Sequence, residues 1–172
     1  MSKKAIHTAA EKGDVQRIES ALKGSFFVKP AHVDDVDDVG NTALNCAAGN
    51  GKLEAVKYLV TKGASIEKGN NLAWTPLHTA CVNGHWEVAA FLLDQQASVN
   101  KADLNGFTAL MHTARTGHYA CAKLLMERKA DTTCTATGGG DKGKTAFEIA
   151  TELQHANVAE LLSAAPVVRL PG

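Results

Sequence analysis

The sequence predicts an all-α solenoid of about five helix–turn–helix repeats with short β-hairpin loops. The first observation is a threonine-centred motif that recurs along the chain, at Thr42, Thr75, Thr108 and Thr145. From one threonine to the next, the numbering advances by 33, 33 and 37. The second is a glycine seven residues after the apolar residue of the first three motifs, in the pairs Leu44–Gly51, Leu77–Gly84 and Leu110–Gly117. A fixed period in this range is typical of stacked repeats.

The copies divide the chain into one predicted domain and a short tail. The repeats cover roughly 1–34, 35–67, 68–100, 101–136 and 137–165, which makes 1–165 the repeat domain. The first copy keeps the same offset between Ile6 and Gly13 but has no hairpin before it, as expected of a terminal repeat. About five extra residues lie in 25–38 and four in 135–141. We expect residues 166–172, which contain two prolines, to form a disordered tail.

The third copy shows why each repeat folds as two helices. Thr75 is a good N-cap, and Pro76 suits the first helical position because the missing N–H is not needed there. A short helix with apolar residues on one face follows, and Gly84 ends it in a left-handed turn. A second helix runs through Val88 and Leu92 at helical spacing. Gln154 stands where the other copies have this glycine, which would cost ~1 kcal/mol if it is left-handed.

The run Thr75-Pro76-Leu77-His78-Thr79-Ala80, recurring in register, resembles the ankyrin-repeat family over about residues 5–163. The resemblance implies a binding module whose concave face is formed by hairpin tips and first helices. It implies a protein partner, for which the chain would serve as an adaptor, scaffold or inhibitor. Short ankyrin proteins of similar size include kinase inhibitors and proteasome-assembly chaperones. We expect no catalytic residues, no cofactor and a monomer.

Positions that vary across ankyrin proteins give the predicted partner-binding residues. They are Asp38, Asn41, Leu72, Trp74, Asn83, Leu104, Phe107 and Arg115. Trp74 and Phe107 are separated by one full repeat, so they should lie on adjacent hairpins and centre an apolar hot spot. The alternative is structural, with Trp74 folding back over its own hairpin, where Ala73 replaces the usual glycine. Trp86 and Tyr119 share another column and are interpreted as half-buried packing residues.

Composition excludes several functional classes. Acidic and basic residues balance at 18 each and aromatic residues make up 5% of the chain, so nucleic acid is not an expected partner. No apolar run approaches the ~18 residues of a membrane span, and the start does not resemble a secretory signal. The four cysteines, Cys46, Cys81, Cys121 and Cys134, have no zinc-site or disulfide-framework spacing. We expect free thiols and a cytoplasmic protein, with the nucleus as a second location.

The run 138–145 matches the phosphate-binding pattern G-x-x-x-x-G-K-[ST], ending in Lys144 and Thr145. That loop requires a buried apolar strand before it, and residues 131–137 are too polar for one. The run is therefore interpreted as a glycine-rich insertion in the last hairpin. Nucleotide binding at residues 138–145 is the alternative function. The seven histidines lack the ligand number and spacing of a metal site.

Asn100 is a candidate modification site. Asparaginyl hydroxylases modify ankyrin proteins at an asparagine preceded by valine with a leucine eight residues before it, and here Val99 and Leu92 fit. The alternative is an unmodified turn residue, since asparagine suits this turn in any case.

Overall fold

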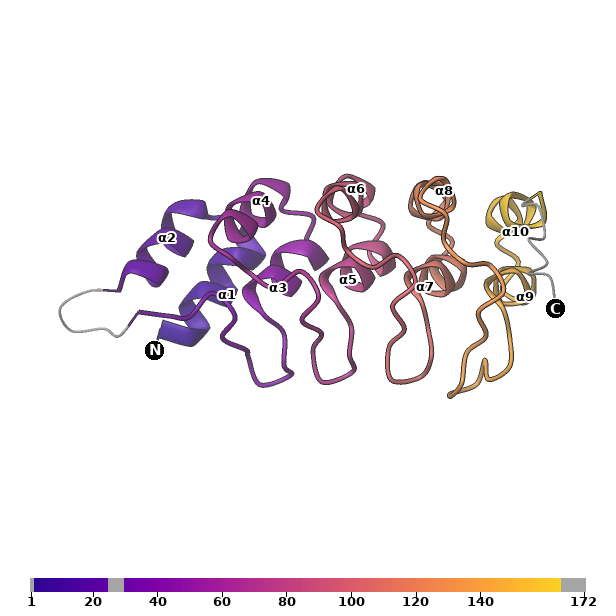
Figure 1. Cartoon of the computed structure of the whole chain (residues 1–172), viewed down its shortest axis with the longest axis horizontal. Coiled ribbons are helices and arrows are strands. Elements are labelled where there is room, and N and C mark those ends of the chain that lie inside the picture. The colour runs from indigo at the N-terminus through magenta and orange to yellow at the C-terminus, as the bar shows by residue number, and fades with distance from the viewer. Residues whose placement is uncertain (1, 25–29, 165–172) are drawn as a thin grey trace.

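The computed structural model describes residues 2–24 and 30–164, which form ten α-helices arranged in five pairs (Figure 1). The helices are α1 (Ser2–Lys12), α2 (Val15–Lys23), α3 (Ala43–Gly49), α4 (Leu53–Thr61), α5 (Pro76–Val82), α6 (Trp86–Asp94), α7 (Ala109–Thr116), α8 (Tyr119–Glu127), α9 (Ala146–Glu152) and α10 (Ala156–Ser163). Each predicted repeat range contains one pair. The predicted tail 166–172 lies outside the described residues.

The pairs stack side by side into an elongated two-row solenoid. In Figure 1, the odd-numbered helices form one row and the even-numbered helices form the other, and the hairpin loops project beyond the odd-numbered row. Each first helix packs on the first helix of the next pair, from α1 against α3 to α7 against α9. The predicted all-α solenoid is therefore confirmed, and the hairpin loops define one edge of the molecule.

Capping threonines start four of the five first helices. The side chains of Thr42, Thr75, Thr108 and Thr145 each accept a hydrogen bond from the backbone N–H three residues later. Three of these caps are reciprocal, because Asn45, His78 or Glu148 accepts a hydrogen bond from the N–H of its threonine. Met111 holds the corresponding position after Thr108 and has no side-chain group that accepts such a bond strongly.

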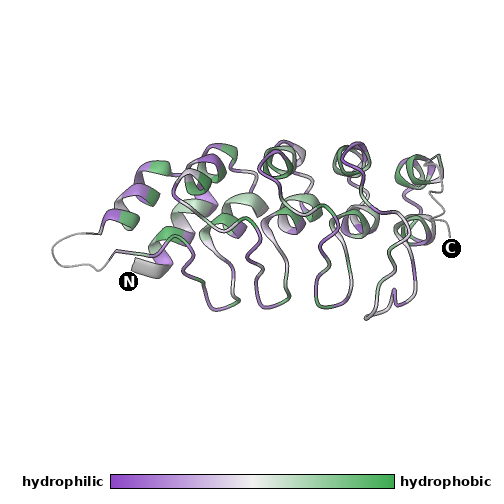
Figure 2. Cartoon of the chain, in the orientation of Figure 1, coloured by the Kyte–Doolittle hydropathy of each residue, from purple (hydrophilic) through white to green (hydrophobic). Residues whose placement is uncertain are grey.

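The core runs between the two rows and is built from repeating apolar columns. In the second helices, Leu59, Leu92 and Leu125 are fully buried and Leu162 is 5% exposed. In the first helices, Leu44, Leu77 and Leu110 are buried. Figure 2 shows hydrophobic and hydrophilic residues side by side on individual helices, the pattern expected when one face packs inward.

The hairpins close through a few backbone hydrogen bonds rather than through strands of a sheet. Within the described residues, the only β-bridges are isolated ones, Val36 with Thr42 and Ala102 with Thr108. Successive hairpins are joined at their tips: the Asn71 N–H donates to the Val39 carbonyl at 3.2 Å, and the Leu104 N–H donates to the Leu72 carbonyl at 3.2 Å. Residues at these tips are thus held in register from one repeat to the next.

The left-handed position after each first helix explains why glycine is replaced only at Gln154. A Cβ atom built on Gly51, Gly84 or Gly117 would lie 2.6–2.8 Å from the ring of the histidine one repeat later, respectively His85, His118 and His155. Gln154 is left-handed, with φ of 60°, and its side chain is exposed. Gln154 therefore has the strained left-handed backbone that its sequence position predicted. Among the described residues, it has no following repeat whose histidine would clash with its Cβ atom.

Candidate functional site

Three apolar side chains stand exposed in a row on consecutive hairpin tips. Val39 is 57% exposed, Leu72 is 52% and Leu104 is 68%. Because the Val39 and Leu72 carbonyls accept the tip-to-tip hydrogen bonds, these residues lie on neighbouring tips of one ladder. We call Val39, Leu72 and Leu104 the tip ridge. Leu72 and Leu104 were predicted site residues, and both are exposed where the sequence placed them.

Phe107 is not part of an exposed hot spot, contrary to the sequence-based expectation. Its side chain is only 3% exposed. The ring lies 5.3 Å from the His112 ring, between centroids, and the Arg115 guanidinium lies 5.5 Å from its centre. The next helix and its arginine cover the ring, so Phe107 is a core residue that supports the ridge from below.

Trp74 is half-buried and leans toward the following hairpin rather than over its own. Its indole Nε1–H donates to Asp103 Oδ2 at 2.8 Å, and its ring lies edge-on to His112 at 4.6 Å between centroids. Ala73 beside it does have the positive φ of 61° that a glycine would favour. Trp74 therefore links the third and fourth repeats and exposes only part of its ring to a partner.

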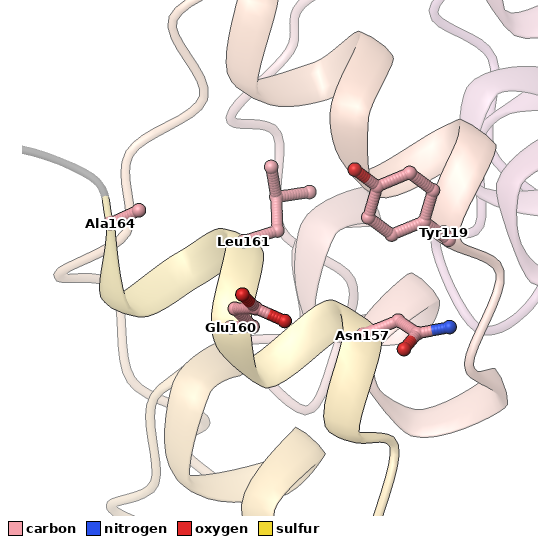
Figure 3. A pocket seen from close by; sticks show the side chains of 5 residues that line it. All are labelled: Tyr119, Asn157, Glu160, Leu161 and Ala164. Carbon is pink, nitrogen blue, oxygen red and sulfur yellow. The ribbon is translucent and has the colours of Figure 1, made fainter.

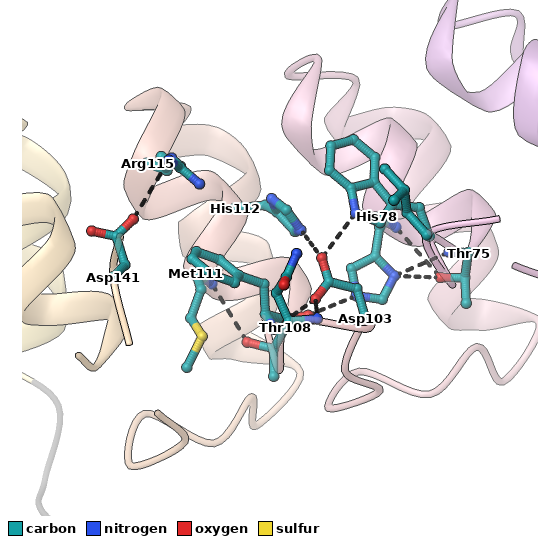
Figure 4. Close-up of polar contacts among 12 residues, drawn as sticks. Thr75, His78, Asp103, Thr108, Met111, His112, Arg115 and Asp141 are labelled. Carbon is teal, nitrogen blue, oxygen red and sulfur yellow. Dashed lines mark hydrogen bonds and ion pairs between the residues drawn. The ribbon is translucent and has the colours of Figure 1, made fainter. Parts of the chain in front are cut away.

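Asp103 is the centre of this cluster (Figure 4). Its Oδ1 accepts from the Asn105 and Phe107 amides at 2.8 and 2.9 Å, and its Oδ2 accepts from Trp74 and from His112 Nε2–H at 3.1 Å. Burial would raise the pKa of Asp103, but these hydrogen bonds outweigh it and hold the pKa below its ordinary value. Burial lowers the pKa of His112, and Asp103 offsets this only in part. An ionised carboxylate thus fixes the surface around Trp74.

His78 braces the same two repeats as a neutral ring. Its Nδ1 accepts from the Thr75 hydroxyl and amide at 2.8 and 3.2 Å, and its Nε2 faces the Phe107 carbonyl at 3.3 Å, which makes Nε2 the protonated nitrogen. Burial, followed by the nearby His112, lowers the pKa of His78 to about 4. Asn45 has the same role one repeat earlier, donating from Nδ2 to the Trp74 carbonyl at 3.0 Å.

Two cations of the last two repeats, Arg115 and Lys144, are compensated by acids. Arg115 Nη2 lies 3.7 Å from Asp141 Oδ2. Lys144 Nζ pairs with Asp141 at 3.2 Å and makes a short hydrogen bond with Glu152. These partners, Glu152 first, raise the pKa of Lys144. The lysine of the phosphate-loop pattern is thus engaged by carboxylates, and turn residues rather than a strand precede it.

The remaining predicted site residues differ in their freedom to bind. Asp38 is exposed at the tip before Val39. Asn41 is half-buried, and its Oδ1 accepts from Asn70 Nδ2 at 2.9 Å, so it joins two hairpins. Asn83 is exposed at the end of α5, with its Nδ2 donating to the Thr79 carbonyl at 2.8 Å. Of these three, Asp38 is the side chain most available to a partner.

A hollow of about 260 Å³ lies beside Asp38, between α1 and the first hairpin. Lys4, Thr8 and Glu11 of α1 contribute to one side, and Val36, Asp37 and Asp38 contribute to the other. Asp37 is engaged by its own hairpin, since its Oδ1 accepts from the Val39 and Asn41 amides at 3.0 and 2.8 Å. The hollow opens next to the first residue of the tip ridge.

Trp86 and Tyr119 begin α6 and α8, in the row of helices away from the hairpins. They are 47% and 44% exposed, more than the half-buried packing role predicted for them. Tyr119 also borders a hollow of about 370 Å³ with Asn157, Glu160, Leu161 and Ala164 (Figure 3). This outer edge offers a matched comparison for the tip ridge, because it carries exposed apolar residues far from the hairpins.

The four cysteines are free thiols, as predicted. Burial raises the pKa of Cys46 to about 12. A hydrogen bond between the Cys81 and Cys121 thiols, together with burial, holds the pKa of Cys81 well above its ordinary value. Thiols with raised pKa values remain protonated near neutral pH and are poor nucleophiles.

The described part of the chain contains neither a cluster of metal ligands nor a membrane-spanning helix. Residues 2–24 and 30–164 contain no group of three His, Cys, Asp or Glu side chains that would hold a metal ion. No helix in the same residues is long and apolar enough to cross a membrane.

Asn100 belongs to a ladder along the repeats. Its Oδ1 accepts from the Asp131 amide at 2.8 Å, as Asp34 accepts from Ser65 and Glu67 from Ser98. The side chain is exposed at a turn. The structure therefore gives Asn100 a bracing role, whether or not it is modified.

Sequence reasoning missed the Asp103 cluster, although a signal was present. Asp37, Asn70 and Asp103 recur at one fixed spacing, once in each of three consecutive repeats, and each accepts backbone amides of its own hairpin. The recurrence would have marked Asp103 as a hairpin brace. The hydrogen bond from Trp74 to Asp103 could not be found in this way, because the neighbouring copies have no tryptophan at the position of Trp74 and the bond therefore does not recur along the sequence.

Comparison with known proteins gives two findings. The sequence model of the family described as ankyrin repeats (3 copies) matches residues 6–103 and 98–167. The transient receptor potential cation channel subfamily A member 1 of Homo sapiens is 35% identical over 60 residues. That alignment covers 35% of this chain but only 5% of the channel protein.

Proposed function

Because the chain belongs to the ankyrin-repeat family, whose members are generally protein-interaction modules, we propose that it binds a protein partner through the tip ridge. It acts as a non-enzymatic adaptor, scaffold or inhibitor. The observation that carries the proposal is the row of exposed apolar residues on three consecutive tips, Val39, Leu72 and Leu104. A contiguous exposed apolar patch is a common mark of an interaction site.

The cluster below the ridge supports the same function. Asp103 and the buried Phe107 fix the hairpins that present Leu72 and Leu104, so little conformational entropy is lost on binding. Trp74 adds part of an aromatic face, and Arg115 lies over the Phe107 ring on α7. Large rigid side chains and arginine dominate interface energies. The proposed anchors are therefore Leu72 and Leu104 of the ridge together with Trp74, in place of the predicted pair Trp74 and Phe107.

The test is a pull-down from the native host's lysate with quantitative mass spectrometry. The wild-type chain is compared with Leu72→Ser/Leu104→Ser and with the control Trp86→Ser/Tyr119→Ser, which removes comparably exposed apolar groups elsewhere. We expect the ridge variant to lose the partner and the control to keep it, with similar melting temperatures for all three. Retention of the partner by the ridge variant would refute the site.

Nucleotide binding at 138–145 is less well supported, since Lys144 is paired with Asp141 and Glu152. An ATP titration by calorimetry, with Lys144→Ala as control, separates the two functions. Micromolar binding that is lost in Lys144→Ala would favour nucleotide binding.

We further propose a monomer in the cytoplasm or nucleus, and Asn100 as a hydroxylation site. Mass spectrometry of the Asn100 peptide from the native host tests the modification, which adds one oxygen atom. An unmodified peptide would contradict it.

A further inference from the structure

The charge of the binding face is uneven in a way that constrains the partner. Residues 69–84, which form the second hairpin and α5, contain no Asp, Glu, Lys or Arg. In the fourth repeat, the Asp103 carboxylate is buried and bonded within the fold. Arg115 and Lys144 are compensated by Asp141 and Glu152. The centre of the face is therefore neutral. Its far end carries these paired charges and the exposed Lys142, which makes no ion pair among the described residues.

Uncompensated negative charge lies at the first hairpin. Glu11 and Asp38 border the hollow next to Val39, and both are exposed. Within the described residues, neither carboxylate makes a hydrogen bond or ion pair with another side chain, whereas Asp37 is occupied by the Val39 and Asn41 amides. Lys4 is the single ammonium among the described residues that line the hollow. Three carboxylates against one ammonium leave this corner negative.

The negative hollow and the apolar ridge form one continuous surface. Asp38, at the hollow, precedes Val39, and the Val39 carbonyl accepts the Asn71 N–H. Leu72 follows Asn71, and its carbonyl accepts the Leu104 N–H. Neighbouring helix pairs pack about 10 Å apart, so the path from the hollow to Leu104 is roughly 30 Å long. An extended segment of about nine residues covers it, at ~3.3 Å per residue.

We propose that the partner presents a protein segment with a lysine or arginine that enters the hollow against Glu11 and Asp38, followed by apolar side chains that pack on the tip ridge. This rests on the proposed function and specifies the chemistry of the segment. Charge complementarity selects a basic group at this corner, because an acidic group would meet unpaired carboxylates. The neutral, apolar centre selects uncharged side chains beyond it.

The experiment uses a phage-displayed library of random twelve-residue peptides as the probe, panned on the immobilised full chain. The consensus peptide is then synthesised, and its affinity is compared at low and at moderately high salt. Glu11→Gln/Asp38→Asn tests the charge, and Leu72→Ser/Leu104→Ser tests the ridge. Trp86→Ser/Tyr119→Ser is the control, and melting temperatures verify that each variant is folded.

We expect enriched peptides to contain Lys or Arg at one end and apolar residues beyond it. Glu11→Gln/Asp38→Asn should weaken the consensus peptide roughly tenfold at low salt and flatten its salt dependence. Leu72→Ser/Leu104→Ser should weaken it by about tenfold or more, and the control should stay within about twofold.

Peptides without a basic bias, or an affinity that Glu11→Gln/Asp38→Asn leaves unchanged, would overturn the inference. The proposed function would survive that result if Leu72→Ser/Leu104→Ser still lowered the affinity. Loss of binding only in Trp86→Ser/Tyr119→Ser would contradict both.

Discussion

Replacing Asp103 with alanine should destabilise the fold much more than the same change at Asp37. Both residues hold the same position of the repeat, in the second and fourth copies. Asp37 accepts two amides of its own hairpin and is half-buried, so water can replace much of what is lost. Asp103 also accepts two amides of its hairpin, and its side chain is 2% exposed. The Asp37 variant is therefore a matched control for the hairpin bonds.

The magnitude follows from the two additional donors at Asp103. Removing its carboxylate leaves Trp74 Nε1–H and His112 Nε2–H without their acceptor. A buried donor left unsatisfied costs about 1–3 kcal/mol. We expect a loss of ~1–2 kcal/mol for Asp37→Ala and ~3–5 kcal/mol for Asp103→Ala. For a chain of this size, the larger loss corresponds to a melting temperature lower by about 8–16 °C.

The assay is urea unfolding at neutral pH followed by far-ultraviolet circular dichroism. The fluorescence of Trp74 should also change in Asp103→Ala, because the indole loses its carboxylate acceptor, while Trp86 contributes a constant background. Losses for the two variants that agree within ~0.5 kcal/mol would refute the reasoning. The Trp74 and His112 bonds would then contribute nothing measurable to stability.

Three further changes test other parts of the structure. The pKa of His78 is about 4 in the folded chain and about 6.5 in the unfolded chain, so the stability that depends on neutral His78 is lost as the pH falls from about 6.5 to 4. His78→Asn places at this position the residue found at Asn45. Urea unfolding at several pH values should show that this variant reduces the pH dependence of stability by up to about 3 kcal/mol. Phe107→Ala should lose ~3–5 kcal/mol of stability in urea unfolding, because it removes a buried aromatic ring. Gln154→Gly should stabilise by about 0.5–1 kcal/mol by relieving the left-handed strain, and a lower melting temperature would contradict this.

The repeat pattern predicted the fold because each motif residue has a local physical role. Thr75 caps a helix and Gly84 ends it, regardless of what the neighbouring repeat contains. Leu92 and its equivalents in the neighbouring repeats, Leu59 and Leu125, are all buried. These features repeat, so several copies support each assignment.

The site was predicted less completely because exposure at the hairpins depends on which side chains of the same and of the next repeat pack against each residue. Phe107 and Trp74 occupy the same column, but His112 and Arg115 cover Phe107, and Asp103 holds Trp74. The column alone does not reveal these partners. Arg115 and Lys144 were likewise evident in the sequence, whereas their pairing with Asp141 was not.

The central claim, that the tip ridge is the binding surface, is tested most directly by site-specific photo-crosslinking. A benzophenone amino acid is placed at Leu72 or Leu104 and, as controls, at Trp86 or Tyr119, all of which are exposed. After irradiation in native-host lysate, we predict covalent capture of the same partner from both ridge positions and none from the controls. Capture from Trp86 or Tyr119 alone would place the binding surface on the outer helices and contradict the assignment.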